Sequence, residues 1–386
     1  MKSFTNKALL VLAVVLCASC HGDQQEECDF AYQANVDEIK DTVQFQDIVE
    51  SYRLIPLESA DGCRIGQVSD LIVKDSLMYV VSDGVYCFDK TGSQKFCINR
   101  KGHAQNEYTR ISSVNVSGGN IYLYDVMQGK VLVFDRFDGT FRRKIDNPHT
   151  VARIFCNGES CVADRSDLAS TVVPGDERFF VYDTNHPENV SQAFLAEAEN
   201  KLPMQGQTTL HEDGFFFTNF WRCQTWKLTE DECLPYFQLI FSPDYAMDKA
   251  ELESLIASKQ PSSESLEKAE KAWGMLNVHE NDCNITGDFR VGKSLASFIF
   301  NKEGKTCIAY KYVKAEGPWQ PNPKCFKSAS QDKMYNVMPA EDIVMLRSIL
   351  GLPALPKQDV GDSNPYNIYC SVSESDNPIV IEYKLK

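Results

Sequence analysis

The residues best suited to chemistry are carboxylates, arginines and aromatics that fall in loops between strand-like segments. Aromatic faces stack on the apolar faces of sugars and other rings, while arginine and aspartate fix polar groups. The candidates for contact with a ligand are Glu107, Tyr108, Asp125, Arg165, Trp221 and Arg222. Asp83 and Asp164 lie in comparable loops, so a converging set of carboxylates is a second interpretation.

Each candidate also has a structural interpretation. Glu107 and Tyr108 can satisfy backbone N–H groups at a crowded turn, and Trp221 can be a packed loop aromatic. No G-x-S-x-G, P-loop or dinucleotide glycine pattern is present. After residue 20 there is neither a C-x-x-C nor an HExxH spacing, which leaves a zinc site without support. We therefore assign no catalytic residue and expect no metal or cofactor.

The N-terminus predicts export and lipid attachment. Lys2 and Lys7 precede an apolar run over 8–16, which is too short to span a membrane but suits a signal peptide. Small residues then precede Cys20, the expected site of cleavage and lipidation, although Cys17 stands where leucine is usual in such motifs. We expect a signal peptide over 1–19 and an acidic tether over 20–50, with the lipid as the only membrane anchor.

Charge excludes some partners. The chain has 54 acidic and 39 basic residues, and removal of two lysines with the signal makes the formal net charge −17. An acidic domain without a Lys/Arg cluster argues against nucleic acid or an anionic lipid surface as the ligand. We expect a monomeric domain whose partner is a glycan, a peptide or an envelope protein.

Cysteines could pair in the oxidising environment outside the cytoplasm. Cys156 and Cys161 would face each other across a tight hairpin, and Cys87 and Cys97 flank a turn at Thr91-Gly92. The other interpretation is that most of the cysteines are small buried hydrophobic residues.

A repeat organises the chain. A β-strand ending in an aromatic residue and Asp or Asn, followed by a turn, recurs with closing aromatics at Phe88, Phe134, Tyr182, Trp226, Phe300 and Tyr383. The first three steps are 46, 48 and 44 residues, the spacing of β-propeller blades. The two longer steps hold helix-like inserts, expected over about 243–275, including Trp273, and about 340–356. Residues 51–386 are therefore predicted to form an all-β, six-bladed β-propeller.

Ring closure follows from a mismatch between the two ends. The last repeat ends on its third strand, over 379–385, whereas the strand-like segment 52–58 has no partner. Because an open edge strand is a liability, we expect 52–58 to complete the last blade. The other interpretation is an open sandwich with a spare edge strand.

Several motifs in order resemble a known family. They are Ile55-Pro56-Leu57-Glu58, Ile65-Gly66, the segment Arg100-Lys101-Gly102-His103-Ala104-Gln105-Asn106-Glu107-Tyr108, the aromatic-Asp hairpins and the C-terminal segment 376–386. From about residue 52 onward the chain resembles the six-bladed β-propeller lipoproteins of Bacteroidetes-type bacteria, whose architecture is related to NHL-repeat propellers. His103 to Asn106 replaces the Gly-Pro of the family's loop. The resemblance implies a fold and a surface location but no activity.

These observations favour a lipid-anchored cell-envelope module that binds a ligand or another protein. The location expected is the outer membrane, surface-exposed or facing the periplasm. The alternative is a propeller hydrolase or lyase that acts on a carbohydrate or a peptide, although the absence of a catalytic motif favours a protein that is not an enzyme.

Overall fold

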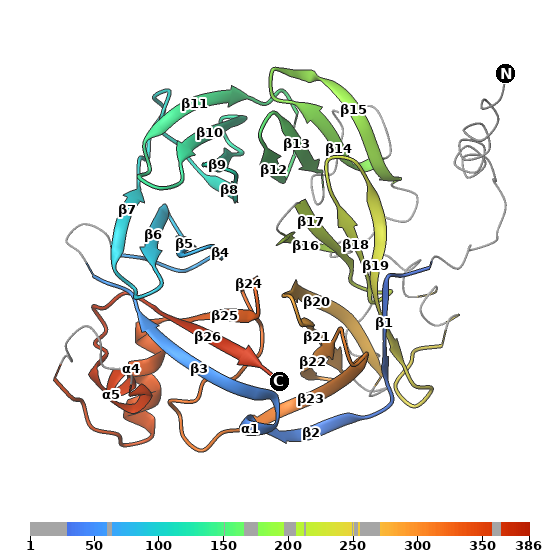
Figure 1. The fold of residues 1–386 in the computed structure, drawn as a ribbon, viewed down its shortest axis with the longest axis vertical. Helices are drawn as coiled ribbons and strands as arrows, with labels where there is room; N and C mark the ends of the chain where they lie inside the picture. The colour runs from blue at the N-terminus through green and yellow to red at the C-terminus, as the bar shows by residue number, and fades with distance from the viewer. Residues whose placement is uncertain are drawn as a thin grey trace, which may run out of the picture.

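Six β-sheets are arranged as blades around a central axis (Figure 1). The computed structural model describes residues 29–59, 64–149, 151–165, 177–196, 206–211, 214–248, 271–356 and 364–386, with residues 250 and 254. The expected signal peptide and Cys20 lie outside this part of the chain. Within it, no helix is long and apolar enough to cross a membrane.

The first three blades are regular four-stranded antiparallel sheets, and in each of them the strands follow one another from the axis outward. Blade 1 contains β4 (Asp70–Lys74), β5 (Leu77–Val81), β6 (Val85–Asp89) and β7 (Gln94–Ile98). Blade 2 contains β8 (Ile111–Ser117), β9 (Asn120–Asp125), β10 (Lys130–Asp135) and β11 (Phe141–Asp146). Blade 3 contains β12 (Arg153–Asn157), β13 (Ser160–Asp164), β14 (Glu177–Asp183) and β15 (His186–Ala196).

The last three blades combine C-terminal strands with one N-terminal strand each. Blade 4 contains β16 (Gly206–His211), β17 (Gly214–Asn219), β18 (Gln224–Leu228), β19 (Cys233–Phe241) and β1 (Tyr32–Val36). Blade 5 contains β20 (Ala272–Glu280), β21 (Asn284–Val291), β22 (Ser294–Asn301), β23 (Thr306–Lys314) and β2 (Ile39–Gln44). Blade 6 contains β24 (Ser328–Ser330), β25 (Lys333–Met338), β26 (Ile379–Leu385) and β3 (Val49–Pro56). Short helices are α1 (Phe45–Ile48), α4 (Ala340–Ile349) and α5 (Pro365–Ser371).

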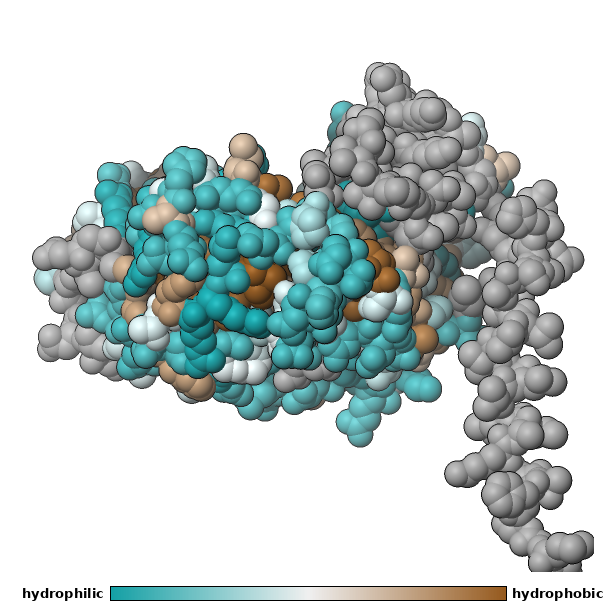
Figure 2. Space-filling view, turned by 90° about the horizontal axis from the view of Figure 1, so that it is seen from above, coloured by the Kyte–Doolittle hydropathy of each residue, from teal (hydrophilic) through white to brown (hydrophobic). Residues whose placement is uncertain are grey.

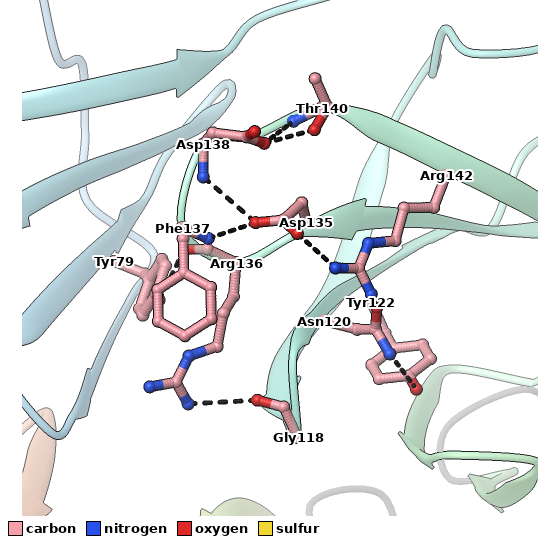
Figure 3. A network of polar contacts seen from close by, with 10 residues as sticks. All are labelled: Tyr79, Gly118, Asn120, Tyr122, Asp135, Arg136, Phe137, Asp138, Thr140 and Arg142. Atoms are coloured by element: carbon pink, nitrogen blue, oxygen red, sulfur yellow. Dashed lines mark hydrogen bonds and ion pairs between the residues drawn. The ribbon is translucent and has the colours of Figure 1, made fainter.

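The sequence repeat corresponds to the third strand of every blade. All six closing aromatics lie in β6, β10, β14, β18, β22 and β26. The aspartate after the aromatic organises the next turn: the Asp135 carboxylate accepts the backbone N–H groups of Phe137 at 2.7 Å and Asp138 at 3.2 Å, and it also pairs with Arg142 (Figure 3). This is the local reason for the repeated aromatic-Asp signal.

The same turn also ties blade 2 to blade 1. The Arg136 guanidinium is buried, donates to the carbonyl oxygen of Gly118 at 3.2 Å and pairs with Asp75 of blade 1. Its backbone carbonyl accepts the hydroxyl of Tyr79 at 2.9 Å (Figure 3). Between neighbouring blades lie six clusters of buried hydrophobic residues, one at each interface. Packing between blades therefore forms the core.

Ring closure by the N-terminal segment is confirmed. Strand β3 pairs antiparallel with β26, with Tyr52 opposite Tyr383. Blade 1 then contacts the closing strand: the backbone N–H of Glu58 donates to Gly92 at 2.9 Å, and the Glu58 carboxylate accepts the N–H of Gln94 at 2.8 Å. Gly92 has φ +90°, and a Cβ there would lie 2.1 Å from the carbonyl oxygen of Pro56. Only glycine fits this junction.

The prediction of a tether over 20–50 is wrong in its second half. Strand β1 pairs parallel with β19, and β2 pairs parallel with β23, so both cover the outer edges of blades 4 and 5. Ala34, Val36, Ile39, Val43 and Phe45 are buried. These alternating apolar residues cover edges that would otherwise be unpaired. The N-terminal segment therefore runs along three successive blades before it closes the ring (Figure 1).

The predicted helical inserts are confirmed in part. Helix α4 lies within the predicted insert over 340–356, and α5 is an additional helix. Most of 243–275 lies outside the described residues, but Trp273 was expected in a helix and instead belongs to strand β20. The side of the molecule seen in Figure 2 is mostly hydrophilic, with hydrophobic residues in small separate patches.

The two cysteine pairings differ in outcome. Cys156 and Cys161 form a disulfide across the β12–β13 hairpin, with their Cα atoms 4.2 Å apart. The pairing of Cys87 with Cys97 is wrong, because neither residue is in a disulfide. Cys97 lies opposite Tyr86, while Cys87 lies opposite Phe96. Since successive residues of a strand point to opposite faces, the two thiols lie on different sides of blade 1.

Candidate functional site

A cavity of about 570 Å³ lies on the propeller axis. It is bordered by the innermost strands of all six blades, mainly through polar side chains. The ionisable or hydrogen-bonding residues of the lining include Ser69, Asp70, Lys74, Asn115, Arg153, Gln207, Thr208, Thr209, His211, Lys227, Tyr236, Asn277, His279, Glu280, Lys302, Lys327, Ser328, Ser330 and Gln331. A cavity of this size and polarity can hold a small hydrophilic molecule.

The position of each inner strand at the edge of its sheet places these side chains. In β4, Leu71 and Val73 pack in the cluster between blades 6 and 1, and Ile72 packs against the cluster between blades 1 and 2. Both faces of the strand therefore contact neighbouring blades, with the period of two expected for a strand. Asp70 and Lys74, at the two ends of the strand, are only partly buried and border the cavity.

Asp70 is the acidic group at one end of the cavity. Its carboxylate accepts the backbone N–H of Leu71 at 2.8 Å. Burial raises the pKa of Asp70 to about 6, and the hydrogen bond from Leu71 and the charges of Arg153 and Lys327 moderate the rise. Arg153 donates to the carbonyl oxygen of Thr208 at 2.7 Å. Blades 1, 3 and 6 thus bring one carboxylate and two cations to one region.

His279 gives the cavity a neutral imidazole. The residue is buried in β20, and burial lowers the pKa of its side chain to about 4, with a further lowering by the charge of Lys327. A hydrogen bond to the backbone of Phe326 opposes this lowering. At neutral pH the ring therefore carries no charge, with one nitrogen bound to Phe326 and the other as an acceptor.

Glu280 forms a compact charged cluster at the other end of the cavity. Its carboxylate lies 2.7 Å from Lys302 Nζ and 3.3 Å from His211 Nε2, and it accepts the hydroxyl of Tyr236. Burial by itself would raise its pKa, but hydrogen bonds from His211, Lys302 and Tyr236 hold the pKa of Glu280 at about 2. Glu280 therefore links blades 4 and 5 as a carboxylate.

Asn277 and Gln207 couple the same two blades nearer the middle. The Asn277 backbone N–H donates to Gln207 Oε1 at 2.6 Å, and Gln207 Nε2 donates back to Asn277 Oδ1 at 3.1 Å. Asn277 has φ +53° and lies in an irregular part of β20. Asparagine tolerates this left-handed conformation better than most residues.

None of the six ligand candidates from the loops borders the axial cavity. Glu107 accepts the backbone N–H of Ala104 at 2.9 Å and so closes its own turn. Tyr108 is buried and donates its hydroxyl to the carbonyl oxygen of Asp83 at 2.8 Å. Both residues hold the connection between blades 1 and 2.

Asp125 and Asp164 serve as buried anchors for loops. Asp125 accepts the backbone N–H groups of Thr109 at 2.6 Å and Met127 at 3.0 Å, and the Gln128 amide at 2.8 Å. Asp164 pairs with Arg178 at 3.2 Å and accepts the hydroxyl of Thr208. These contacts occupy the carboxylates within the fold.

Arg165, Trp221 and Arg222 are also separate from the cavity. Arg165 is buried, and its backbone N–H donates to Arg178 at 3.0 Å. Trp221 is buried and stacks on Trp273, with ring centroids 5.7 Å apart. The backbone N–H of Arg222 donates to the side chain of Asn219 at 3.1 Å. A ligand-binding role for the six loop residues stays a prediction.

Among the described residues, no group of three or more His, Cys, Asp or Glu side chains is placed to hold a metal ion.

A family match accompanies this geometry. Residues 31–384 match the model described as "Domain of unknown function (DUF4934)", which covers all six blades. The chain belongs to this family. The sequence matches no curated protein.

A solved structure of an exported Bacteroides protein supports the fold of this DUF4934 member. The chain is similar to a Bacteroides fragilis protein described as exported, with a TM-score of 0.70 and 16% identity over 92% of this chain and 99% of that one. A DUF4221 family member from Bacteroides vulgatus aligns with a TM-score of 0.47 and 10% identity, over 88% of this chain and 97% of that one.

The axial residues were not among the candidates from the sequence, because those candidates all lie in expected loops. Asp70, Arg153 and Glu280 lie at ends of innermost strands. Their signal was available: polar residues stand at both ends of an apolar run in the first strand of a repeat, as in Asp70-Leu71-Ile72-Val73-Lys74. The innermost strand of a blade has no partner on its axial edge, so the residues at its ends can reach the axis.

Proposed function

We propose that this protein is a lipid-anchored, cell-envelope β-propeller that binds a small polar ligand in its axial cavity. The observation that carries the proposal is the polar, unfilled cavity bordered by every blade. Had apolar side chains filled the axis, a role as a protein-interaction platform would be favoured. A cavity lined by hydrogen-bonding groups instead favours a hydrophilic molecule of limited size.

The proposed cellular location rests on the N-terminal sequence and on the similar Bacteroides fragilis protein. Cys20 follows an apolar run and small residues typical of lipoprotein signals, and the similar Bacteroides fragilis protein is described as exported. We place the chain in the outer membrane, anchored through the lipid on Cys20. Strand β1 begins at Tyr32, so the ring starts a short distance along the chain from the anchor.

The test is a binding screen of the mature protein, residues 20–386, in detergent micelles. A glycan array and a library of small polar molecules followed by native mass spectrometry would identify ligands. Ser330→Trp fills the cavity, and Ser375→Trp at an exposed loop outside it is the matched control. We expect ligand binding to be lost in Ser330→Trp and kept in Ser375→Trp. Equal binding by both variants would place the ligand elsewhere.

One observation favours the alternative of a hydrolase or lyase. The raised pKa of Asp70, about 6, falls in the range of carboxyl groups that act as general acids near neutral pH. The ligands found in the screen, supplied as oligosaccharides or peptides, should then be cleaved by the wild type and not by Asp70→Asn. Intact recovery from both proteins would exclude this alternative.

A further inference from the structure

We propose that the ligand is a small hydroxylated carboxylic acid, such as a sugar acid, and that Arg153 and Lys327 bind its carboxylate. This inference rests on the proposed function and deepens it by naming the ligand class.

The two cations are available to a ligand. Arg153 and Lys327 both border the cavity, yet both are exposed to solvent. They belong to blades 3 and 6, and both charges act on Asp70 of blade 1. Their charged groups therefore lie within electrostatic reach of the same carboxylate from two different blades. Arginine binds carboxylates through two parallel N–H groups, and lysine adds a point charge.

These three residues share one end of the cavity. Asp70 and Arg153 begin β4 and β12, and Lys327 immediately precedes β24. Because each blade repeats the same strand order, the innermost strands run in the same direction, and their first residues lie toward one face. His211 and Glu280 end β16 and β20, so they lie toward the opposite face.

The charges at the opposite end are largely engaged with one another. Glu280 has a side chain only 8% exposed and is paired with Lys302 and His211. Asp75, which follows β4, pairs with Arg136. Lys74 lies next to Asp75 in sequence, so its positive charge is close to a carboxylate. Asp282 follows β20 and also borders this end. A ligand carboxylate is therefore favoured at the end that holds Arg153 and Lys327.

The rest of the lining fits hydroxyl groups. Gln207, Asn277, Thr209 and neutral His279 border the cavity. The Gln207 and Asn277 amides bind each other, and Thr209 donates to the carbonyl oxygen of Val278. Each of these amides has a second N–H and further lone pairs, and the Thr209 hydroxyl can still accept, so the lining can both donate to and accept from ring hydroxyls. The lining thus matches a molecule with one charged and one polyhydroxylated part.

Asp70 should make binding depend on pH. When ionised, Asp70 competes with the ligand for Arg153 and Lys327, the charged groups that act on it most strongly. His279 stays neutral between pH 7.5 and 5 and so does not add to the pH dependence. When protonated, it leaves both cations to the ligand. Since the pKa of Asp70 is about 6 and sugar acids remain ionised well below that, affinity should rise as pH falls from 7.5 to 5.

The experiment compares galacturonate with galactose, which differ in the carboxylate at C6, by ligand-observed NMR titration of the mature protein. At pH 5 we expect galacturonate to bind at least about tenfold more tightly than galactose. Arg153→Gln and Lys327→Gln should each weaken galacturonate binding by about tenfold, with little effect on galactose. Lys40→Gln, on the outer strand β2, removes the same charge away from the axis and should change neither.

Asp70→Asn provides an independent readout. It should raise the affinity for galacturonate at pH 7.5 to the level seen at pH 5 and remove the pH dependence. Equal affinity for galacturonate and galactose would overturn the inference and leave the proposed function standing. The same holds if Arg153→Gln and Lys327→Gln weaken galacturonate binding no more than Lys40→Gln does. Binding of neither sugar would also overturn it, while the library screen with Ser330→Trp decides the proposed function separately.

Discussion

Replacement of Glu280 by glutamine should cost stability in a way that depends on pH. The change keeps the size and shape of the side chain but removes the charge that pairs with Lys302 and holds His211 between blades 4 and 5. Because the Glu280 side chain is only 8% exposed, water cannot replace the lost contacts. Removing one partner of such a pair leaves a poorly solvated charge behind.

The magnitude follows from the pKa. A carboxyl whose pKa falls from 4.5 to about 2 on folding stabilises the native state by about 3 kcal/mol at neutral pH. Because the pKa of Glu280 is lower in the folded state, its contribution to stability grows as pH rises. The contribution is complete above pH 4.5, where both folded and unfolded chains are ionised, and it is lost as pH falls toward 2. We expect Glu280→Gln to lower the free energy of unfolding by about 2 to 4 kcal/mol at pH 7.

The assay is urea unfolding followed by tryptophan fluorescence at pH 7, 5, 4 and 3. The gap between wild type and Glu280→Gln should narrow steadily below pH 4.5. Glu50→Gln removes an exposed partner of Lys384 and should leave the unfolding midpoint unchanged, since exposed ion pairs contribute little. A gap below about 0.5 kcal/mol at pH 7, or one that does not change with pH, would refute the reasoning.

Three further predictions follow from the ring, the axis and the anchor. Gly92→Ala should destabilise the protein by several kcal/mol, since the new Cβ would meet backbone at the ring closure. Gly158→Ala, also at positive φ but in open space, should cost about 1 kcal/mol. Similar thermal unfolding midpoints for the two variants would contradict the tight junction at Gly92. The wild type should lose at most about 3 kcal/mol of stability as pH rises from 4 to 6, because the raised pKa of Asp70 favours the folded state only while its carboxyl is protonated. Asp70→Asn should not show this loss. Parallel curves of unfolding free energy against pH for the two proteins would oppose this prediction. Cys20→Ser should abolish labelling with radioactive palmitate and release the protein from membranes, and Cys17→Ala should not; retained label in Cys20→Ser would disprove the anchor.

Much of the fold could be predicted from the sequence because the repeat is local. A closing aromatic residue marks the third strand of each blade, followed by an aspartate turn in the first three blades, and its period gives the number of blades. The pairing of the segment 52–58 with the last strand was predictable because the last repeat lacks a strand, whereas the register that places Tyr52 opposite Tyr383 comes from the structure. Strands β1 and β2 were not predicted, since each is short and its parallel partner lies about two hundred or more residues away along the chain.

The site was predicted less well because its residues come from different blades. The contact of Glu280 with His211 and the electrostatic effect of Arg153 on Asp70 depend on how sheets far apart in sequence are arranged, which no local pattern records. The loop residues Tyr108 and Asp125 looked equally suitable in sequence. In the structure their polar atoms bind backbone groups of the same connections, which only the three-dimensional arrangement shows.

The most direct test of the axial site is hydrogen–deuterium exchange of the mature protein with and without a ligand from the screen. If the ligand binds on the axis, exchange should slow in peptides that cover β4, β12, β16 and β20. The loops that hold Glu107, Asp125 and Trp221 should be unchanged. Protection confined to those loops, with the innermost strands unaffected, would contradict the account.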